Sequence, residues 1–246
     1  MTLRTVLWAL AALAFSGLPA AAADDDYAAA RDEMLRVIEL HARHAQPETR
    51  IEALDKRVLA AMGRVPRHAF VPPEIARYAY LDTPLPLGHE QNISQPFIIA
   101  LMTHLLDVQP GDRVFETGTG AGYHAAVLAE LSAQVYSVEV IEPLAMSAAR
   151  RLDELDYGTV ETRMGDGYFG WPAQAPFDKI LLKEAVDHLP PALLRQLKPG
   201  GKLVAPIGPL KDVQFLTVVE KLPDGTLGQR RVLEVRFSPL QGGDRI

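Results

Sequence analysis

The strongest chemical signal in this chain is a run of three glycines between two carboxylates. Residues 114–123 read Val-Phe-Glu-Thr-Gly-Thr-Gly-Ala-Gly-Tyr, so an apolar segment ends near Glu116 and leads into Gly118, Gly120 and Gly122. Glycine lets a backbone turn sharply and lets a ligand lie against the main chain. Glu139, near the end of the next apolar segment, is placed to hold two ribose hydroxyls. The pattern predicts a site for a nucleotide-type cofactor.

Spacing and charge indicate which cofactor this segment holds. Dinucleotide sites use Gly-x-Gly-x-x-Gly, whereas here Tyr123 stands where the third glycine would fall. A carboxylate at Glu116 repels phosphate and suits a cation, and S-adenosylmethionine (SAM) carries a sulfonium and an ammonium but no phosphate. A glycine turn that only packs a helix on a sheet is the alternative, and the two carboxylates in register count against it. We therefore predict a SAM site at Glu116, Gly118, Thr119, Gly120, Gly122, Tyr123 and Glu139.

The elements around this segment must form a parallel sheet, because apolar strands alternate with helical segments from Asp112 onward. Strands are predicted at 113–117, 134–140, 159–164, 177–182 and 202–207, and helices at about 121–131, 142–155 and 189–197. Residues 213–221 and 230–237 should form a closing hairpin. The fold class is three-layer α/β, Rossmann-like, with a mostly parallel seven-stranded sheet.

An N-terminal helical appendage precedes this core. Helical periodicity covers residues 27–43 and 50–62, and a proline-rich extended stretch follows up to Ser94. Pro96 then opens a helix that runs through Leu106. We predict a helical and substrate-loop region over 24–110 and a cofactor-binding core over 111–246.

Composition excludes several classes of function. The net charge of −6 and the lack of a basic run argue against nucleic acid as a partner. The absence of cysteine excludes disulfides, thiolate metal sites and cysteine nucleophiles. His41 and His44 have no carboxylates at matched spacing, so no metal is expected.

The first 23 residues have the order of a secretory signal peptide. Arg4 precedes the apolar run Val6–Phe15, and a small-residue stretch ends before Asp24. The run is too short to span a bilayer comfortably. We predict export, to the periplasm, and no stable membrane insertion after cleavage; an unused signal would leave the protein cytoplasmic.

Residues 58–122 and 198–240 closely resemble the protein-L-isoaspartate O-methyltransferases, the bacterial repair enzymes in particular. The resemblance is carried by these words: Val58-Leu59-Ala60-Ala61-Met62, Val65-Pro66-Arg67-His68, Phe70-Val71-Pro72, Pro84-Leu85-Pro86-Leu87-Gly88-His89, Ile93-Ser94-Gln95-Pro96, Gly118-Thr119-Gly120, Gly165-Asp166-Gly167 and Leu197-Lys198-Pro199-Gly200-Gly201. Ile-Ser-Gln-Pro is much more specific than the glycine loop.

The resemblance implies a methyltransferase fold whose last two strands are exchanged, acting on proteins or peptides that carry L-isoaspartyl residues. We expect the protein to be a monomer. It places SAM on the 116–122 loop, with Asp166 and Gly167 toward the adenine. Ser94 would be the catalytic residue, beside the methyl group and the isoaspartyl carboxylate. Such an acceptor is already ionised, so the reaction needs alignment and desolvation rather than a general base.

The chain departs from the family pattern at two segments. Asn92 replaces the usual threonine before Ile93-Ser94, and Glu90 replaces a usual glycine. Lys183-Glu184-Ala185-Val186 stands where bacterial members have Thr-Ala-Ala-Pro. This segment ends a strand where open α/β sheets bind ligands. Substrate-binding candidates are therefore His89, Asn92, Ile93, Lys183 and Glu184; a solvated Lys–Glu surface pair is the alternative.

Three other functions stay open. The acceptor could be another carboxylate, or the chain could be a non-catalytic SAM-binding relative. The non-catalytic alternative gains weight from the predicted export, because an exported enzyme needs SAM and SAM is made in the cytoplasm. A NAD-dependent reductase is disfavoured by the glycine spacing.

Overall fold

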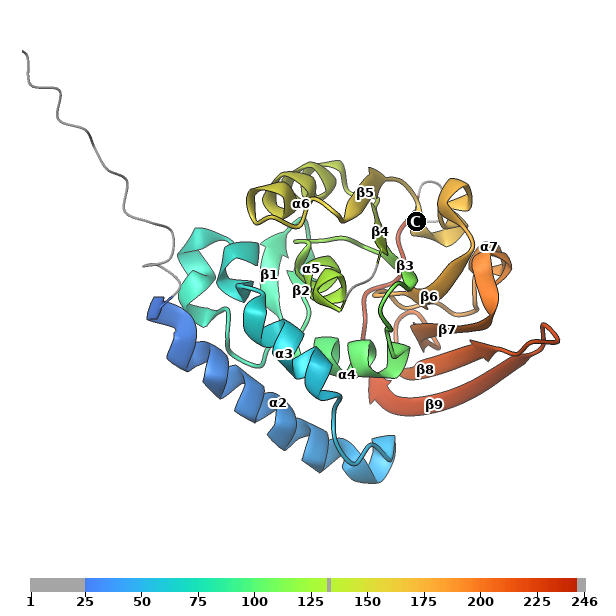
Figure 1. Cartoon of the computed structure of the whole chain (residues 1–246), viewed down its shortest axis with the longest axis horizontal. Coiled ribbons are helices and arrows are strands. Elements are labelled where there is room, and N and C mark those ends of the chain that lie inside the picture. Colours follow the sequence, from blue (N-terminus) through green and yellow to red (C-terminus); the bar gives the residue numbers. More distant parts are fainter. Residues whose placement is uncertain (1–24, 132–133, 243–246) are drawn as a thin grey trace, which may run out of the picture.

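The computed structural model describes residues 25–131 and 134–242, so the predicted export signal at 1–23 lies outside the described residues. Figure 1 shows a twisted sheet with helices on both of its faces and a long helix along one side. Within the described ranges, no helix is both long enough and apolar enough to cross a membrane.

Seven strands form the central sheet. Their spatial order is β5 (Glu161–Met164), β4 (Gln134–Glu139), β3 (Arg113–Thr117), β6 (Phe177–Leu181), β7 (Leu197–Ile207), β8 (Gln214–Lys221) and β9 (Leu227–Val235). The strands from β5 to β7 pair in parallel, and β8 and β9 add an antiparallel hairpin. In chain order β8 is the sixth strand of this sheet and lies beside β7, the fifth, while β9, the seventh, forms the edge. The predicted fold class is confirmed.

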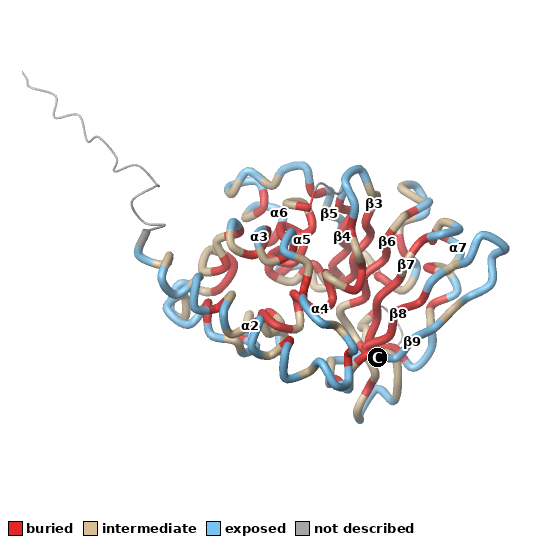
Figure 2. The backbone as a smooth tube through the Cα atoms, turned by 60° about the horizontal axis from the view of Figure 1, so that its bottom comes forward, coloured by how far each residue is buried: buried red, intermediate tan, exposed pale blue. Residues whose placement is uncertain are grey.

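Two hydrophobic cores sandwich the sheet. Successive side chains of a strand point to opposite faces, so Val114 enters the core beneath α4 (Pro96–Leu106), α5 (Tyr123–Glu130) and α6 (Glu142–Glu154). Phe115 enters the opposite core, with Phe177 of β6 and Leu193 of α7 (Pro191–Gln196). Buried backbone runs through the strands between these helical layers (Figure 2). The short helices η4 (Gly167–Phe169) and η5 (Pro172–Gln174) lie between β5 and β6 in the chain.

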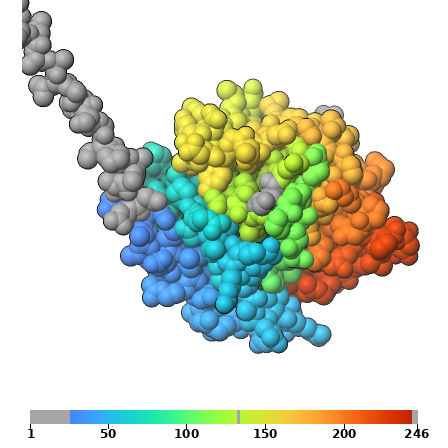
Figure 3. All heavy atoms as spheres, in the orientation of Figure 1, coloured from blue at the N-terminus to red at the C-terminus, as the bar shows by residue number. Residues whose placement is uncertain are grey.

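The N-terminal region packs on the first of these cores rather than standing apart. Helix α2 (Ala28–Thr49), preceded by η1 (Asp25–Tyr27), buries Met34, Ile38 and Ala42, which share one helical face. It packs against α4 and α3 (Lys56–Arg64). The space-filling view shows these blue and cyan residues directly against green residues of the following segment (Figure 3).

The helix boundaries differ most from the sequence prediction at two places, the end of α2 and the start of α3. Helix α2 runs to Thr49, past the predicted end at 43 and through Pro47; a proline this close to the end removes a single hydrogen bond of the last turn. Helix α3 begins at Lys56 rather than 50, because Asp55 caps it by accepting from the backbone N–H of Arg57 at 2.8 Å.

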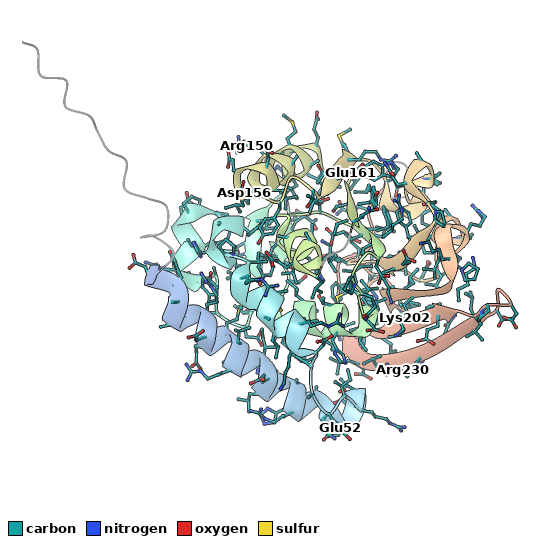
Figure 4. The ribbon with its side chains drawn as sticks, in the orientation of Figure 1. Glu52, Arg150, Asp156, Glu161, Lys202 and Arg230 are labelled. Atoms are coloured by element: carbon teal, nitrogen blue, oxygen red, sulfur yellow. The ribbon has the colours of Figure 1, made fainter. Side chains whose placement is uncertain are left out.

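The end of α4 is tied to the sheet by charge. Lys202 Nζ of β7 lies 3.1 Å from Asp107 Oδ2, just after α4, and 3.7 Å from Glu220 Oε1 of β8. Lys202 and Arg230 project near one another at this side of the molecule (Figure 4). Helix α4, which follows Ser94, is therefore held at its far end as well as along its buried face.

Candidate active site

A cavity of about 390 Å³ opens at the carboxyl ends of β3, β4 and β6. This is where an open α/β sheet reverses its strand order and where such sheets bind ligands. Its lining includes the glycine loop after β3, the end of β4, strand β2 (Gln91–Ile93) with Ser94 after it, and Lys183-Glu184 after β6. The segment 234–241, at and after the end of β9, forms a further wall.

The glycine loop adopts the conformation that its composition predicts. Gly118 and Gly120 have φ of 60° and 56°, in the left-handed region that disfavours side chains. At Gly118 a side chain would also meet another residue, because an added Cβ would lie 1.7 Å from Glu184 Oε1. Gly118, Thr119, Gly120 and Tyr123 all line the cavity, as predicted for the cofactor loop. Gly122 caps helix α5 and is not among the lining residues.

Glu139 holds the glycine loop in place through hydrogen bonds to the backbone. Its Oε2 accepts from the backbone N–H of Gly120 at 2.7 Å, and its Oε1 accepts from that of Ile141 at 2.9 Å. Charge-assisted bonds to backbone donors hold a carboxylate firmly. Each oxygen keeps a second lone pair, so the group can also accept from a ligand hydroxyl in the cavity that it lines.

Glu116 supports the loop from beneath and does not line the cavity. It is fully buried, with Lys183 Nζ 3.0 Å from its Oε2, and its Oε1 accepts from Ser137 Oγ at 2.7 Å. Ser137 Oγ lies 2.6 Å from Thr119 Oγ1 in the loop. Burial raises the pKa of Glu116, and the neighbouring Lys183 ammonium opposes that rise. Direct contact of Glu116 with a cofactor stays a prediction.

The Gly-Asp-Gly turn meets the cavity through its glycines. Gly165 and Gly167 line it, whereas Asp166 does not. The Asp166 carboxylate instead accepts from the backbone N–H of Tyr168 at 2.8 Å and caps η4. The predicted contact of Asp166 with adenine is not visible in this arrangement and stays a prediction.

The substrate side of the cavity is a small hairpin. Strand β1 (Leu85–Gly88) pairs with β2, and Asn92, Ile93 and Ser94 line the cavity. His89 and Glu90 form the turn, with φ of 52° and 58°, as in a type I′ turn. His89 is exposed and lies outside the cavity lining. Of the residues predicted to contact substrate in this hairpin, only Asn92 and Ile93, the last two of β2, therefore line the cavity.

Arg67 holds Ser94 in place, a role that its position in the Val65-Pro66-Arg67-His68 motif did not predict. This arginine, in η2 (Arg67–Phe70), is fully buried; its Nη2 donates to the Ser94 carbonyl at 2.7 Å and its Nε donates to the Ala79 carbonyl at 2.8 Å. Its guanidinium carbon lies 4.8 Å from the ring centroid of Tyr123. Arg67 thereby connects the Ser94 segment to the start of α5 beside the glycine loop.

Asp82 is a second residue whose role in positioning the site is not predicted from the sequence. Its carboxylate accepts from the Phe97 backbone N–H at 2.7 Å and from Gln95 Nε2 at 2.8 Å, and it contacts His41 Nδ1 of α2. The first turn of a helix has unsatisfied N–H groups, and Asp82 satisfies one of them from the loop after η3 (Pro73–Tyr78). It therefore fixes where α4 begins, two residues after Ser94.

Lys183 and Glu184 both line the cavity, so the alternative of a solvated surface pair is wrong. The Lys183 side chain is 11% exposed and pairs with Glu116. Glu184 Oε2 accepts from Thr117 Oγ1 at 2.5 Å. Burial raises the pKa of Glu184 to about 7; Thr117 and Lys183 oppose the rise, and Glu139 and Glu116 add to it.

His124 completes the cavity wall from α5. It is buried, and its Nε2 lies 2.8 Å from Thr103 Oγ1 of α4. Burial, with Lys183 and Arg67 nearby, lowers the pKa of His124 well below its ordinary value. The imidazole is therefore neutral at physiological pH. Within the described ranges, no group of three or more His, Cys, Asp or Glu side chains could hold a metal ion.

The cavity fits a cofactor of SAM's size and charge. Small-molecule sites are clefts of roughly 300–1,000 Å³, and this cavity lies within that range. Its glycine-loop side offers bare backbone and the carboxylates of Glu139 and Glu184, while the nearest ammonium, Lys183, is paired with Glu116. An open α/β sheet with such a loop after its first strand and an acid ending the next defines the class of SAM-dependent methyltransferases.

Comparison with known proteins specifies the class further. The family profile of protein-L-isoaspartate(D-aspartate) O-methyltransferase (PCMT) matches residues 45–245. Protein-L-isoaspartate O-methyltransferase 1 of Cupriavidus necator is 51% identical over 221 residues, which are 90% of this chain and 85% of that protein. The chain belongs to the protein-L-isoaspartate O-methyltransferase family.

Two solved structures share the fold. One, a protein-L-isoaspartate O-methyltransferase, is 29% identical with a TM-score of 0.74, over 86% of this chain and 66% of that chain. This chain thus spans about two thirds of that solved chain. The other is a Plasmodium falciparum beta-aspartate methyltransferase (PCMT) in complex with S-adenosyl-L-homocysteine, 23% identical with a TM-score of 0.72, over 87% of this chain and 99% of that chain.

Proposed function

We propose that this protein is a SAM-dependent carboxyl methyltransferase that acts on L-isoaspartyl residues of damaged proteins or peptides. The observation that carries the proposal is that the glycine loop and the Ser94 segment, from different parts of the chain, line one cavity. The family membership and the identity of about half to the C. necator enzyme support the same activity.

When bound, SAM supplies an electrophilic methyl group on a sulfonium. Gly118–Ala121 and Glu139 would hold it, because they form the loop side of the cavity. The isoaspartyl carboxylate is ionised at neutral pH and needs no base. Ser94 can orient that carboxylate through its hydroxyl, and neutral His124 keeps a competing positive charge out of the wall. The remaining task of the cavity walls is to align the acceptor and remove water from it.

Methyl transfer to a synthetic isoaspartyl peptide tests the activity. Radiolabel from SAM should appear on that peptide and not on the matched peptide with ordinary aspartate. Ser94→Ala should lower kcat/KM by about 10–100-fold, since one orienting hydrogen bond contributes on the order of 1.4–3 kcal/mol. SAM affinity, measured by calorimetry, should stay within a factor of three. Equal labelling of the two peptides would refute the assignment.

A second candidate keeps the cofactor and changes the acceptor. It is favoured by Asn92 and by Lys183 and Glu184, which line the cavity and depart from the bacterial pattern. A panel of carboxylate acceptors would then show a better substrate than the isoaspartyl peptide. SAM binding without transfer to any acceptor would instead indicate a non-catalytic relative.

Export is the last part of the proposal. Residues 1–23 have the order of a signal peptide, so we propose a periplasmic protein that acts as a monomer. N-terminal sequencing of the protein from its native cells should begin near Asp24. Recovery of chains that retain Met1 in the cytoplasm would contradict export and leave the methyltransferase assignment unchanged.

A further inference from the structure

We infer that Glu184 is a cofactor-binding residue that recognises a cationic group of SAM with its carboxylate. This inference rests on the proposed function. The resemblance expects a small neutral residue in this segment, so the feature belongs to this chain rather than to the family pattern.

The first support is position. Glu184 lines the cavity, and its Oε1 occupies the space that a side chain on Gly118 would take, 1.7 Å from an ideal Cβ. Its Oε2 accepts from Thr117 Oγ1 at 2.5 Å, one residue before that glycine. The carboxyl group therefore lies on the glycine loop, which is the cofactor side of the cavity, and not on the Ser94 side.

The second support is charge. The ammonium adjacent in sequence, Lys183, is 3.0 Å from Glu116 Oε2, so it is already paired within the protein. Glu139, on the same side of the cavity, has both oxygens on backbone N–H groups. An ionised Glu184 thus adds a negative charge that a cationic ligand would balance. SAM carries two positive groups, a sulfonium and an ammonium, and a carboxylate is the complementary protein group for either.

The third support is a fixed backbone. On one side, the Ala185 N–H donates to the Ser238 carbonyl at 2.8 Å and the Ala185 carbonyl accepts from Leu240 at 2.9 Å. Val186 makes a similar pair of bonds with Pro206 and Gly208, at 3.0 and 2.9 Å. The residues after Glu184 are therefore held by two neighbouring segments, which keeps the carboxyl group near the loop.

Cation binding at Glu184 must be linked to a proton. With a pKa of about 7, the carboxyl group is largely protonated below neutral pH. The charged groups that face it are Lys183 beside it in the chain, Glu116 on β3 and Glu139 on β4. His124 on α5 and Glu234 and Arg236 at the end of β9 line the same cavity. A cation selects the ionised form, so binding releases a proton at low pH and strengthens as pH rises toward 7.

Titration calorimetry with SAM and with S-adenosylhomocysteine (SAH), from pH 5.5 to 7.0, tests the inference. This range stays below the titration of the ligand's own amino group, about 7.7–8.0. The wild type should bind SAM about tenfold more tightly at pH 7.0 than at pH 5.5, with proton release seen as a buffer-dependent enthalpy. Glu184→Gln should bind about tenfold more weakly at pH 7.0 and release no proton. Glu184→Asp should restore the proton release.

Glu154→Gln is the matched control, because Glu154 is an exposed carboxylate of α6 outside the cavity; it should behave as wild type. Loss of affinity for SAM alone would assign the sulfonium as the partner, and equal loss for SAM and SAH would assign the ammonium. Wild-type binding that is unchanged by pH and by Glu184→Gln, or tighter binding by that variant, would overturn the inference while SAM binding itself stands. Failure of wild type to bind SAM would overturn the proposed function as well.

Discussion

Arg67 Nη2 donates a hydrogen bond of 2.7 Å to the carbonyl oxygen of Ser94, from a side chain that is fully buried. The same guanidinium donates to Ala79 and lies over the ring of Tyr123. One planar group with several donors thus connects three segments of the chain, at Ala79, Ser94 and Tyr123. Lysine cannot replace it, because an ammonium lacks the fork of fixed donor directions.

Arg67→Lys should therefore impair the substrate side more than the cofactor side. We expect a loss of about 2–4 kcal/mol in the free energy of unfolding, because a buried charge is left imperfectly paired. We also expect at least a tenfold fall in kcat/KM for the isoaspartyl peptide, with SAM affinity changed less. Urea denaturation, methyl-transfer kinetics and calorimetry measure the three quantities. Arg150→Lys, at an exposed residue of α6 (Figure 4), serves as the control and should change none of them.

Ionisation of Glu184 should lower the stability of the free protein as pH rises from 5 to 8. The pKa of Glu184 is raised from 4.5 to about 7 in the folded state, so between these values the folded chain binds more protons than the unfolded chain. Stability then falls with rising pH, by roughly 3 kcal/mol for a shift of this size. The buried Glu116, whose pKa is also raised, acts in the same direction. The buried His124, whose pKa is lowered, acts in the opposite direction as pH rises towards 6.5.

Glu184→Gln should remove the contribution of Glu184, since glutamine does not titrate, so wild type should lose stability relative to this variant between pH 5 and pH 8. Urea denaturation of both proteins at pH 5 and pH 8, without cofactor, measures the difference. If wild type and Glu184→Gln differ in stability by the same amount at both pH values, the raised pKa of Glu184 is contradicted.

Gly118→Ala should weaken SAM binding by more than tenfold. The left-handed φ costs about 1–2 kcal/mol for a residue with a Cβ, and that Cβ would meet the Glu184 carboxyl at 1.7 Å. Gly200→Ala is the matched control, because Gly200 has φ of 82° and open space around it; it should show the conformational cost alone. In a Glu184→Ala background, Gly118→Ala should cost less stability than in wild type. Additive effects would show that the two residues do not meet.

Glu90→Gly should stabilise the protein by about 0.5–1 kcal/mol. Glu90 has φ of 58° at the second central position of the β1–β2 turn, where glycine is preferred. Thermal unfolding would report the gain. Glu52→Gly supplies the comparison: Glu52 is exposed (Figure 4) and has no positive φ, so glycine there should destabilise. Equal destabilisation by the two substitutions would contradict the turn assignment.

The sheet was predictable from sequence because apolar strands alternate with amphipathic helices. The predicted strand 113–117 matches β3, and the helix from Pro96 through Leu106 matches α4. The closing hairpin predicted over 213–221 and 230–237 is present as β8 and β9. Boundaries were less accurate where one side chain decides them, as Asp55 does for α3.

The site was predictable only in part, because several of its contacts join segments distant in the chain. The glycine loop, Glu139 and Ser94 are recognisable from local motifs, and all line the cavity. Nothing in the local sequence shows that Arg67 is buried, since its partners are Ala79, Ser94 and Tyr123. The contact of Glu184 with Thr117 spans two strands and had no sequence signal either.

The segment after β9 leaves the edge of the sheet and returns to pair with Ala185, so residues 234–241 enclose the reaction chamber from outside. Proteolysis that removes the residues after Ser238 would remove Leu240 and Gln241 and open this side of the chamber to solvent. A bulky fusion attached after Gln241 would lie at the rim of the chamber and hinder the entry of a polypeptide substrate. Purification handles for kinetic work on this protein belong elsewhere on its surface.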